Sequence, residues 1–148
     1  GTIIKHIPGH GLAKVDSHNF TPTTNKSLSF LKKKDFLAFK SKNTLFAMTA
    51  HVIFNKIDPK NTVTHSKKLI KIIREQIKFK NIIISDDLSM KSLKHSLKEN
   101  TISAFNAGCN LVLHCNGKLK EMEIVANYSP KVNSFIIKKT SEFYKNIS

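Results

Sequence analysis

The sequence lacks the features of a membrane-spanning or disulfide-stapled protein. Its longest apolar runs, such as Ile82 to Ile84 and Leu111 to Leu113, stop within a few residues, whereas a helix that crosses a bilayer needs about 20. Only Cys109 and Cys115 are present among 148 residues, too few for a disulfide framework. These absences predict a protein without a transmembrane helix in a reducing compartment, and we expect the cytoplasm. A signal peptide is a separate question, because the chain begins with Gly1 and not with Met.

Arginine is almost absent, and this bears on the meaning of the positive charge. The formal net charge is +15, yet Arg74 is the only arginine among 25 basic residues. A balance this basic is typical of proteins that bind polyanions. Nucleic-acid readers, however, usually need the fork of arginine, and the lysines here are scattered without aromatic residues between them. We favour a solvated lysine surface, with no nucleic-acid or membrane partner. The alternative is a non-catalytic, lysine-rich α/β module that binds an acidic partner such as RNA.

Short apolar runs alternate with longer amphipathic stretches. Nearly uniform apolar runs are typical of parallel strands buried on both faces. The strands expected on this basis are Thr2–His6, Leu45–Val52, Asn81–Ser85 and Asn110–His114. Helical spacing predicts helices at Asn25–Lys40, at Ser66–Phe79 behind a Ser66 N-cap, at Ser92–Ala107 before Gly108, and from Lys118 onward with a break at Pro130. Four βα units fit a small doubly wound sheet or half of a (β/α)₈ barrel.

The polar residues favour the barrel, because they follow the carboxyl end of each expected strand. They are Lys5, His6, His10, Asp16 and His18 after the first, His51 after the second, Asp86 and Asp87 after the third, and His114 and Asn116 after the fourth. In a barrel, the active site is assembled at this rim. No dinucleotide fingerprint follows a strand, since Gly9-His10-Gly11 lacks a third glycine and a following helix.

Five motifs, in this order along the chain, carry a family resemblance. They are Lys5-His6-Ile7-Pro8-Gly9-His10-Gly11, Asp16-Ser17-His18, Met48-Thr49-Ala50-His51, Ile83-Ile84-Ser85-Asp86-Asp87-Leu88-Ser89-Met90 and Ala107-Gly108-Cys109-Asn110. The chain resembles bacterial β-N-acetylhexosaminidases of glycoside hydrolase family 3. The resemblance implies a (β/α)₈ TIM barrel, of which residues 1–148 would be a fragment, the C-terminal half with four βα units.

Asp86 is the expected catalytic nucleophile. A retaining glycosidase needs a carboxylate to attack the anomeric carbon and a proton donor for the leaving oxygen. Asp86 follows an apolar strand, and the family's Ser-Asp motif implies the nucleophile at this position. We expect Asp87 to point away and brace the loop, because consecutive residues at a strand end face opposite sides. The competing interpretation is that the Asp-Asp pair caps a helix beginning near Leu88.

A histidine and an aspartate are expected to supply the proton. An aspartate that binds one ring nitrogen of a histidine sets the tautomer and basicity of the other. The resemblance implies that His18 is the acid/base and Asp16 its partner, in place of a second carboxylate. It also implies sugar-binding roles for Lys5 and His6. As an isolated tripeptide, Asp16-Ser17-His18 would more often be a simple turn.

No cofactor and no metal site is expected. His6 and His10 are four residues apart, but Pro8 and Gly9 between them exclude the helix that would place both on one face. His10 and His51 are interpreted as loop or supporting residues, not as catalytic ones. The two cysteines flank the last strand, where buried thiols are the usual case.

These observations predict a retaining enzyme that removes terminal, non-reducing β-linked N-acetylglucosamine. The resemblance implies N-acetylglucosamine-containing muropeptides or disaccharides as substrates, released during cell-wall recycling, and phosphorolysis stays open beside hydrolysis. The other expected partner is the missing N-terminal half of the barrel. Because four βα units leave two sheet edges unpaired, we expect the isolated chain to be poorly stable or to self-associate.

Overall fold

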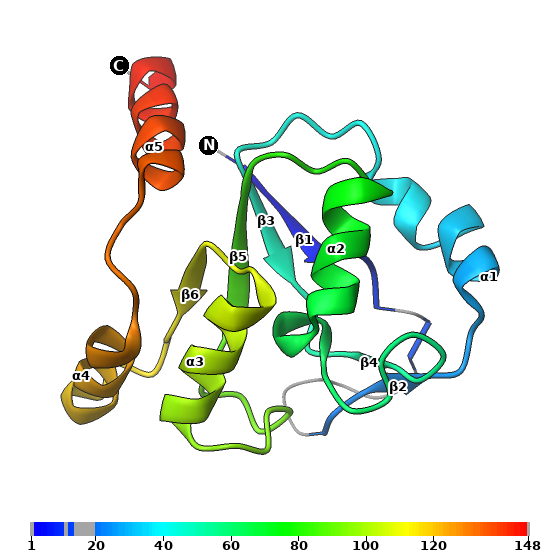
Figure 1. The fold of residues 1–148 in the computed structure, drawn as a ribbon, viewed down its shortest axis with the longest axis horizontal. Helices are drawn as coiled ribbons and strands as arrows, with labels where there is room; N and C mark the ends of the chain where they lie inside the picture. The colour runs from blue at the N-terminus through cyan, green and yellow to red at the C-terminus, as the bar shows by residue number, and fades with distance from the viewer. Residues whose placement is uncertain (1, 11, 14–19, 148) are drawn as a thin grey trace.

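A four-stranded parallel sheet forms the centre of the computed structural model, which describes residues 2–10, 12–13 and 20–147 (Figure 1). Its strands are β1 (Ile3–Ile7), β3 (Phe46–Thr49), β5 (Ile82–Asp87) and β6 (Leu111–Leu113). They lie side by side in the order β1-β3-β5-β6, which is their order along the chain. In a doubly wound sheet, the order in which successive strands are added reverses at a switch point. The sequential order seen here is instead that of a barrel. The predicted α/β class is therefore confirmed.

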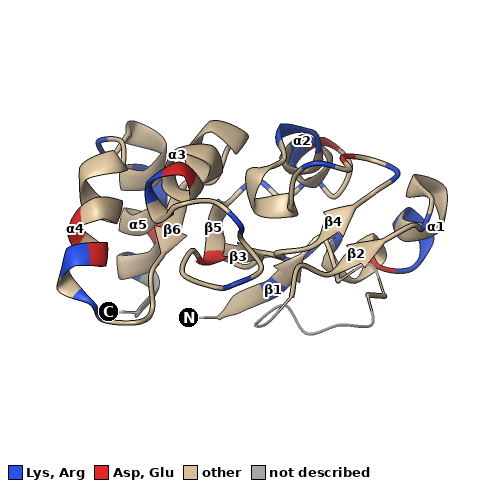
Figure 2. Ribbon diagram, turned by 90° about the horizontal axis from the view of Figure 1, so that it is seen from below, with Lys and Arg blue, Asp and Glu red and all other residues tan. Residues whose placement is uncertain are grey.

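The helices follow the strands in turn. Described along the chain, they are α1 (Leu28–Lys33), the 3₁₀ turns η1 (Phe36–Phe39) and η2 (Val63–His65), α2 (Lys67–Glu75), α3 (Leu97–Ala107), α4 (Leu119–Tyr128) and α5 (Ser134–Ile147). Figure 2 shows α2 and α3 on the same face of the sheet. Ser66 caps α2 by accepting a hydrogen bond from the amide of Leu69, as predicted. Gly108 ends α3 in the left-handed region at φ 115°, where glycine has no Cβ penalty.

Three predicted helices and one predicted strand have clearly different bounds, and the Ser66–Phe79 helix is one of them, because it ends at Glu75. Asn25–Lys40 divides into α1 and η1, because Leu31 and Phe36 are both buried and their spacing of five does not fit one helical face. The Ser92–Ala107 helix begins only at Leu97, where Ser96 and Glu99 form a capping box. The predicted strand Leu45–Val52 ends at Thr49. Beyond it, β4 (Ile53–Phe54) pairs with β2 (Thr23–Thr24) in a separate parallel ladder that the sequence did not indicate.

The core lies between the sheet and its helices. Ile4, Ala47 and Ile83 stand in register across β1, β3 and β5 and pack in one cluster with Leu69 and Ile73 of α2. β5 is buried on both faces, as its apolar run predicts. β1 is not, because Ile3 and Lys5 are exposed on the other face. The edge strands of this sheet are β1 and β6, and each of them pairs with one other strand of the sheet.

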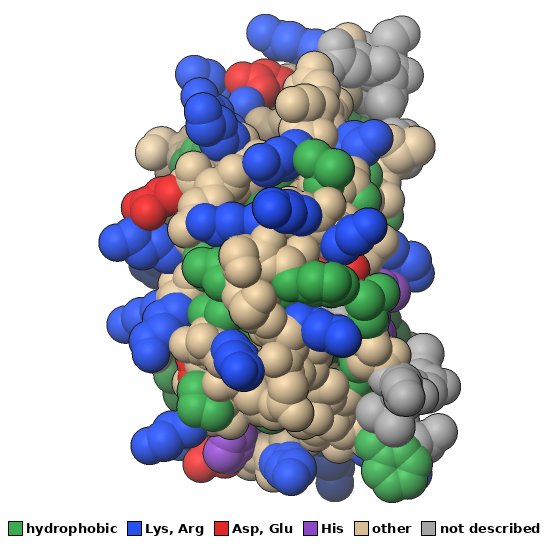
Figure 3. All heavy atoms as spheres, turned by 90° about the vertical axis from the view of Figure 1, so that its right-hand side faces the viewer, with side chains coloured by type: hydrophobic (Ala, Val, Ile, Leu, Met, Phe, Trp, Pro, Cys, Tyr) green, Lys and Arg blue, Asp and Glu red, His purple; other side chains and the backbone are tan. Residues whose placement is uncertain are grey.

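The surface is rich in lysine, and its lysines are spread out. On the face seen in Figure 3, the lysine side chains stand among polar and hydrophobic groups and do not line one groove. Within the part of the chain that the structure describes, no helix is long and apolar enough to cross a bilayer. Cys109 is buried, and burial raises the pKa of its thiol to about 12. Cys115 is exposed, so the expectation of two buried thiols is wrong for Cys115.

Arg74, the single arginine, joins α2 to the amino ends of two strands. Its Nη1 atom donates to the carbonyl oxygens of Phe79 and Asn81 at 3.0 and 2.6 Å, and Nη2 donates to Asn110 Oδ1 at 2.7 Å. The same Oδ1 atom accepts the backbone amide of Ile83 in β5 at 2.9 Å. The planar guanidinium reaches three acceptors at once, which a lysine ammonium cannot match with this geometry.

Replacing Arg74 is expected to destabilise the protein. Arg74→Met should lower the free energy of unfolding by about 3 kcal/mol, because three carbonyl acceptors lose a charged donor. Arg74→Lys should recover only part of that loss. The matched control is Lys71→Met on the same helix, where the lysine side chain is 71% exposed and its Nζ atom is 3.9 Å from Glu75 Oε1, and it should change stability by less than about 0.5 kcal/mol. Urea unfolding measures all three, and an equal effect of the two methionine variants would contradict this role.

His65, at the end of η2, is expected to make the fold sensitive to acid. Burial lowers the pKa of His65 to about 4, while an unfolded histidine titrates near 6.5. Between these two pKa values the unfolded state therefore binds more protons than the folded state. The free energy of unfolding keeps its full value with respect to His65 above about pH 6.5, and it falls by about 1.4 kcal/mol per pH unit from there down to about pH 4. His65→Gln should reduce the loss of stability on acidification, measured by urea unfolding across this window. Exposed His95→Gln is the control, and an unchanged acid loss in His65→Gln would refute the assignment.

Candidate active site

Polar side chains gather where the parallel strands end. His6 lies near the carboxyl end of β1, Asp86 and Asp87 close β5, His51 follows β3, and His114 follows β6. Because all four strands are parallel neighbours, these positions share one edge of the sheet. This is the edge at which a barrel enzyme binds its substrate.

Asp86 and His6 face one another at this edge. His6 Nε2 is 3.5 Å from Asp86 Oδ2, and the two side chains are 27% and 18% exposed. The other carboxylate oxygen, Oδ1, accepts a hydrogen bond of 2.8 Å from the backbone amide of Asp87. The carboxylate is therefore held by one oxygen, and the second lies beside the imidazole at a partly open surface.

His6 is a neutral imidazole near neutral pH. Burial lowers its pKa, and the Asp86 carboxylate opposes that shift only in part. The rings of His10 and His6 pack edge to face with centroids 5.4 Å apart, and both His10 and the positive charge of Lys5 lower the pKa of His6 further. Lys5 itself is exposed. The structure thus brings His6 to Asp86 directly and leaves Lys5 at the surface beside them.

Asp87 braces the adjoining loops, as predicted. Its carboxylate accepts hydrogen bonds from the backbone amide and hydroxyl of Ser89, at 3.0 and 2.7 Å, and from the amide of Cys115 at 3.2 Å. The competing interpretation, a helix cap, is wrong, because residues 88–95 contain no helix and the next N-cap is Ser96. The two aspartates therefore have different surroundings.

A buried chain of hydrogen bonds holds the end of β5. His51 is 1% exposed, its Nδ1 atom is 2.8 Å from Thr64 Oγ1, and its Nε2 atom is 3.0 Å from the Asp87 carbonyl oxygen. Burial lowers the pKa of His51, so the ring carries one proton. A carbonyl only accepts, so this proton is on Nε2, and Thr64 must donate to Nδ1.

The chain extends one step further into β3. Thr64 Oγ1 is 2.8 Å from Thr49 Oγ1, and because the Thr64 proton points to His51, Thr49 is the donor. Thr49 and Thr64 thereby fix the tautomer of His51. The interpretation of His51 as a supporting residue agrees with these contacts. Thr49 belongs to one of the family motifs but had no role assigned to it, and Thr64 had no sequence signal, since partners 13 or 15 residues apart follow no local pattern.

His114 serves the neighbouring helix and not the Asp86 surface. Its Nε2 atom is 2.9 Å from Glu121 Oε2, to which Asn116 also donates. Hydrogen bonds from His114 and Asn116 lower the pKa of Glu121 to about 2. Glu121 lies in α4, so this cluster ties the end of β6 to that helix. Sequence analysis had noted His114 and Asn116 but not their acidic partner.

Two predicted residues lie outside the described part of the chain. Asp16 and His18 belong to residues 14–19, so the expected dyad stays a prediction from the sequence. Among the residues that are described, no three His, Cys, Asp or Glu side chains are grouped closely enough to hold a metal ion. The geometry of the candidate site therefore rests on His6, Asp86 and Asp87, with His51 behind them.

Comparison with known proteins identifies the family. Residues 1–139 match the family described as "Glycosyl hydrolase family 3 N terminal domain". The beta-hexosaminidase of Neisseria meningitidis serogroup C (strain 053442) is 39% identical over 117 residues, which are 76% of this chain and 32% of that protein. The beta-hexosaminidase of Methylobacillus flagellatus is 34% identical over 128 residues, covering 83% of this chain and 37% of that protein.

Solved structures of similar proteins support the same family. CbsA from Thermotoga neapolitana superposes with a TM-score of 0.82 at 30% identity, over 99% of this chain and 37% of that one. NagZ from Neisseria gonorrhoeae, solved in complex with N-trifluoroacetyl-D-glucosamine, gives a TM-score of 0.79 at 30% identity, over 94% and 41%. The chain thus spans about a third of the length of its relatives and folds as a part of their barrel. It belongs to glycosyl hydrolase family 3.

Proposed function

We propose that this chain is part of a retaining glycoside hydrolase that removes terminal, non-reducing β-linked N-acetylglucosamine. The observation that carries the proposal is the pairing of Asp86 with His6 at the carboxyl ends of β5 and β1. Relatives named beta-hexosaminidase support it, as does the similar NagZ structure that contains a glucosamine derivative.

Asp86 is the nucleophile in this proposal. Its Oδ1 atom is held by the Asp87 amide, while Oδ2 lies at the partly open surface. Oδ2 attacks the anomeric carbon as the bond to the leaving oxygen breaks, which gives a glycosyl ester. Water then attacks the same carbon and releases the sugar with its original configuration. The His51 hydrogen bond to the Asp87 carbonyl keeps the backbone beside Asp86 in place.

His18, oriented by Asp16, is the acid/base. It donates a proton to the leaving oxygen in the first step and takes one from water in the second. Neutral His6 can donate its N–H to a sugar oxygen, and the exposed Lys5 next to it in the chain binds a hydroxyl group in this proposal. The proposed substrates are N-acetylglucosamine-containing muropeptide fragments, and the proposed setting is cell-wall recycling in the cytoplasm.

Asp86→Asn should abolish hydrolysis of an aryl β-N-acetylglucosaminide. The expected loss in kcat is about 10³-fold or more with little change in KM, because the amide cannot form the glycosyl ester. The assay uses the chain alone and a chimera in which residues 1–148 replace the matching segment of the Neisseria meningitidis relative.

Asp87→Asn is the matched control for Asp86→Asn. It removes the same charge one residue away, from a carboxylate turned toward Ser89 and Cys115. Asp87→Asn should lower the melting temperature and leave most of kcat in place. A well-folded chimera that is inactive with Asp86 intact, or an Asp86→Asn chimera that is as active as the unchanged one, would contradict the proposal. Salt-sensitive RNA binding by an inactive, folded chimera would favour the lysine-rich binding module instead.

His18→Ala should lower kcat/KM in a way that depends on the leaving group. For an N-acetylglucosamine disaccharide the expected loss is about 10²- to 10⁴-fold, because an alkoxide leaving group needs a proton. For a dinitrophenyl glycoside the loss should be much smaller, because that leaving group departs without one. Asp16→Asn should give an intermediate loss for the disaccharide. Equal losses for both substrates in His18→Ala would rule out the acid role.

A further inference from the structure

The positive charge of the chain is concentrated in one stretch. Residues 26–80, which run from the approach to α1 to the approach to β5, contain 14 of the 25 basic residues and 3 of the 10 acidic ones. The structure describes this stretch throughout. It contributes +11 of the formal net charge of +15, and the rest of the chain contributes +4. The charge is therefore unevenly distributed over the protein.

The basic residues of this stretch lie on outer helices of the barrel. Figure 2 shows them on α1 and α2, and the side of the molecule that carries α1 is the one seen in Figure 3. α2 follows β3, which lies inside the sheet, whereas the rest of a closed barrel adjoins the edge strands β1 and β6. This side of the molecule therefore also faces outward in a complete barrel.

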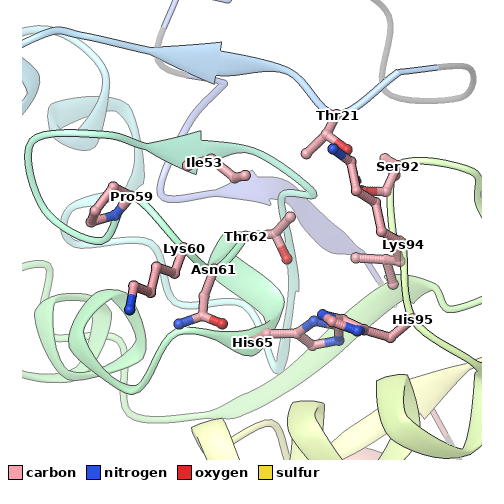
Figure 4. Close-up of a pocket in the computed structure, with 11 residues that line it drawn as sticks. Thr21, Ile53, Pro59, Lys60, Asn61, Thr62, His65, Ser92, Lys94 and His95 are labelled. Atoms are coloured by element: carbon pink, nitrogen blue, oxygen red, sulfur yellow. Dashed lines mark hydrogen bonds between the residues drawn. The ribbon is translucent and has the colours of Figure 1, made fainter.

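Ten exposed lysines on α1, on α2 and in the turns that follow them form what we call the lysine face. They are Lys32, Lys33, Lys34, Lys40, Lys42, Lys67, Lys68, Lys71, Lys78 and Lys80. Lys60 is not included, because it lines a separate polar cavity with Ser92 and His95 (Figure 4). None of the ten belongs to the candidate active site.

Acidic side chains neutralise little of the charge on the lysine face. Asp58 is 7% exposed, and its carboxylate accepts hydrogen bonds from its own loop. Asp35 is half-buried. Glu75 is the one exposed acid of residues 26–80, and its Oε1 atom is 3.9 Å from Lys71 Nζ. Ten exposed lysines thus face one exposed carboxylate, and such an excess creates a positive potential beyond the surface.

The lysines of α4 and α5 have different surroundings. Residues 97–147 contain seven lysines and four glutamates. Lys118 Nζ is 3.3 Å from Glu121 Oε1, and Lys139 Nζ is 2.9 Å from Glu142 Oε2. A lysine-rich composition that affects the whole chain therefore does not account for the lysine face, because the acidic partners are scarce on that side alone.

Two turns of the lysine face enclose a cavity between them. The cavity has a volume of about 310 Å³, and it is lined by residues 39–42, which end η1, and by residues 76–79, which follow α2. Lys40, Lys42 and Lys78 are among the lining residues, and none of the lining residues carries a carboxylate. A phosphate group at this position has three lysines around it, each of which can contact it as a point charge.

The residue types on this face suit a lipid surface better than a nucleic acid. Readers of nucleic acids use the arginine fork, or they stack bases on aromatic side chains along a groove. Arg74 is occupied by the backbone carbonyls of Phe79 and Asn81. Phe30 is the one exposed aromatic residue of residues 26–80. Lysines spread over outer helices can instead each contact a different phosphate of a charged lipid surface.

We propose that the lysine face binds the surface of a bilayer that contains anionic phospholipids. The ammonium groups contact headgroup phosphates, one of which lies between Lys40, Lys42 and Lys78. Phe30 in α1 and Leu37 in η1 are 37% and 57% exposed, and they enter the headgroup layer, as apolar residues beside lysines do in membrane-surface segments. This proposal replaces the expectation that the lysines are only solvated. It does not depend on the proposed glycosidase function, because the lysine face contains no residue of the candidate active site.

The test is co-flotation of the chain, and of the chimera described above, with vesicles of phosphatidylcholine alone or mixed with equimolar phosphatidylglycerol. We expect binding to the mixed vesicles only. Raising the salt concentration from about 0.1 M to about 0.5 M should weaken this binding at least about tenfold, because salt screens the charges. A triple variant with Lys40→Gln, Lys42→Gln and Lys78→Gln should bind at least about tenfold more weakly. Leu37→Gln should bind about threefold more weakly, with an unchanged salt dependence.

The matched control removes the same three charges from the other side of the molecule. It combines Lys120→Gln, Lys131→Gln and Lys138→Gln, three exposed lysines of α4, of the connection that follows it and of α5. Its affinity for the mixed vesicles should stay within about twofold of that of the unchanged chain, because these lysines lie away from the bound face. Melting temperatures verify that both triple variants are folded.

Three results would overturn the proposal. Equal losses of affinity in the two triple variants would show that only the net charge matters. Equal binding to both kinds of vesicle would show that anionic headgroups are not recognised. Tighter binding to a single-stranded RNA than to the mixed vesicles at the same salt concentration would identify a nucleic acid as the partner.

Discussion

The hydrogen bond from His51 Nε2 to the carbonyl oxygen of Asp87 fixes the carboxyl end of β5, and the candidate active site depends on it. It is made by a buried ring whose tautomer is set by Thr64 and Thr49, from η2 and β3. A hydroxyl chain of this kind has one arrangement of protons that satisfies every member. The position of Asp86 is thus determined by side chains that are themselves inaccessible to substrate.

The adjacent aspartates illustrate how a strand end separates two roles. Alternation along a strand sends consecutive side chains to opposite sides. Asp87 satisfies the amides and hydroxyl of two loops, whereas Asp86 keeps one oxygen at a partly open surface beside a neutral imidazole. The same side-chain chemistry becomes structural in one position and is available for reaction in the next.

Local signals in the sequence predicted most of the architecture. Ser66 as an N-cap, Gly108 as the end of α3 and the break at Pro130 are all confirmed, because each depends on residues within a few positions. The late start of α3 also had a local signal, the Ser96 and Glu99 capping box, which the apolar spacing from Ser92 obscured. The β2 and β4 ladder had none, because two-residue strands are set by tertiary pairing.

For the site, Asp87 was predicted correctly from strand geometry, while the roles of Asp86, Asp16 and His18 rest on the family motifs and stay predictions. The Thr49–Thr64–His51 chain and the cavity at Ser92 were beyond sequence analysis, because their members come together only in the fold. Arg74 adds a contrast, since it ties the amino ends of the strands while His51 ties the carboxyl end. Loss of either tie should therefore destabilise the fold, but only loss at the carboxyl end should also displace the side chains that act on a substrate.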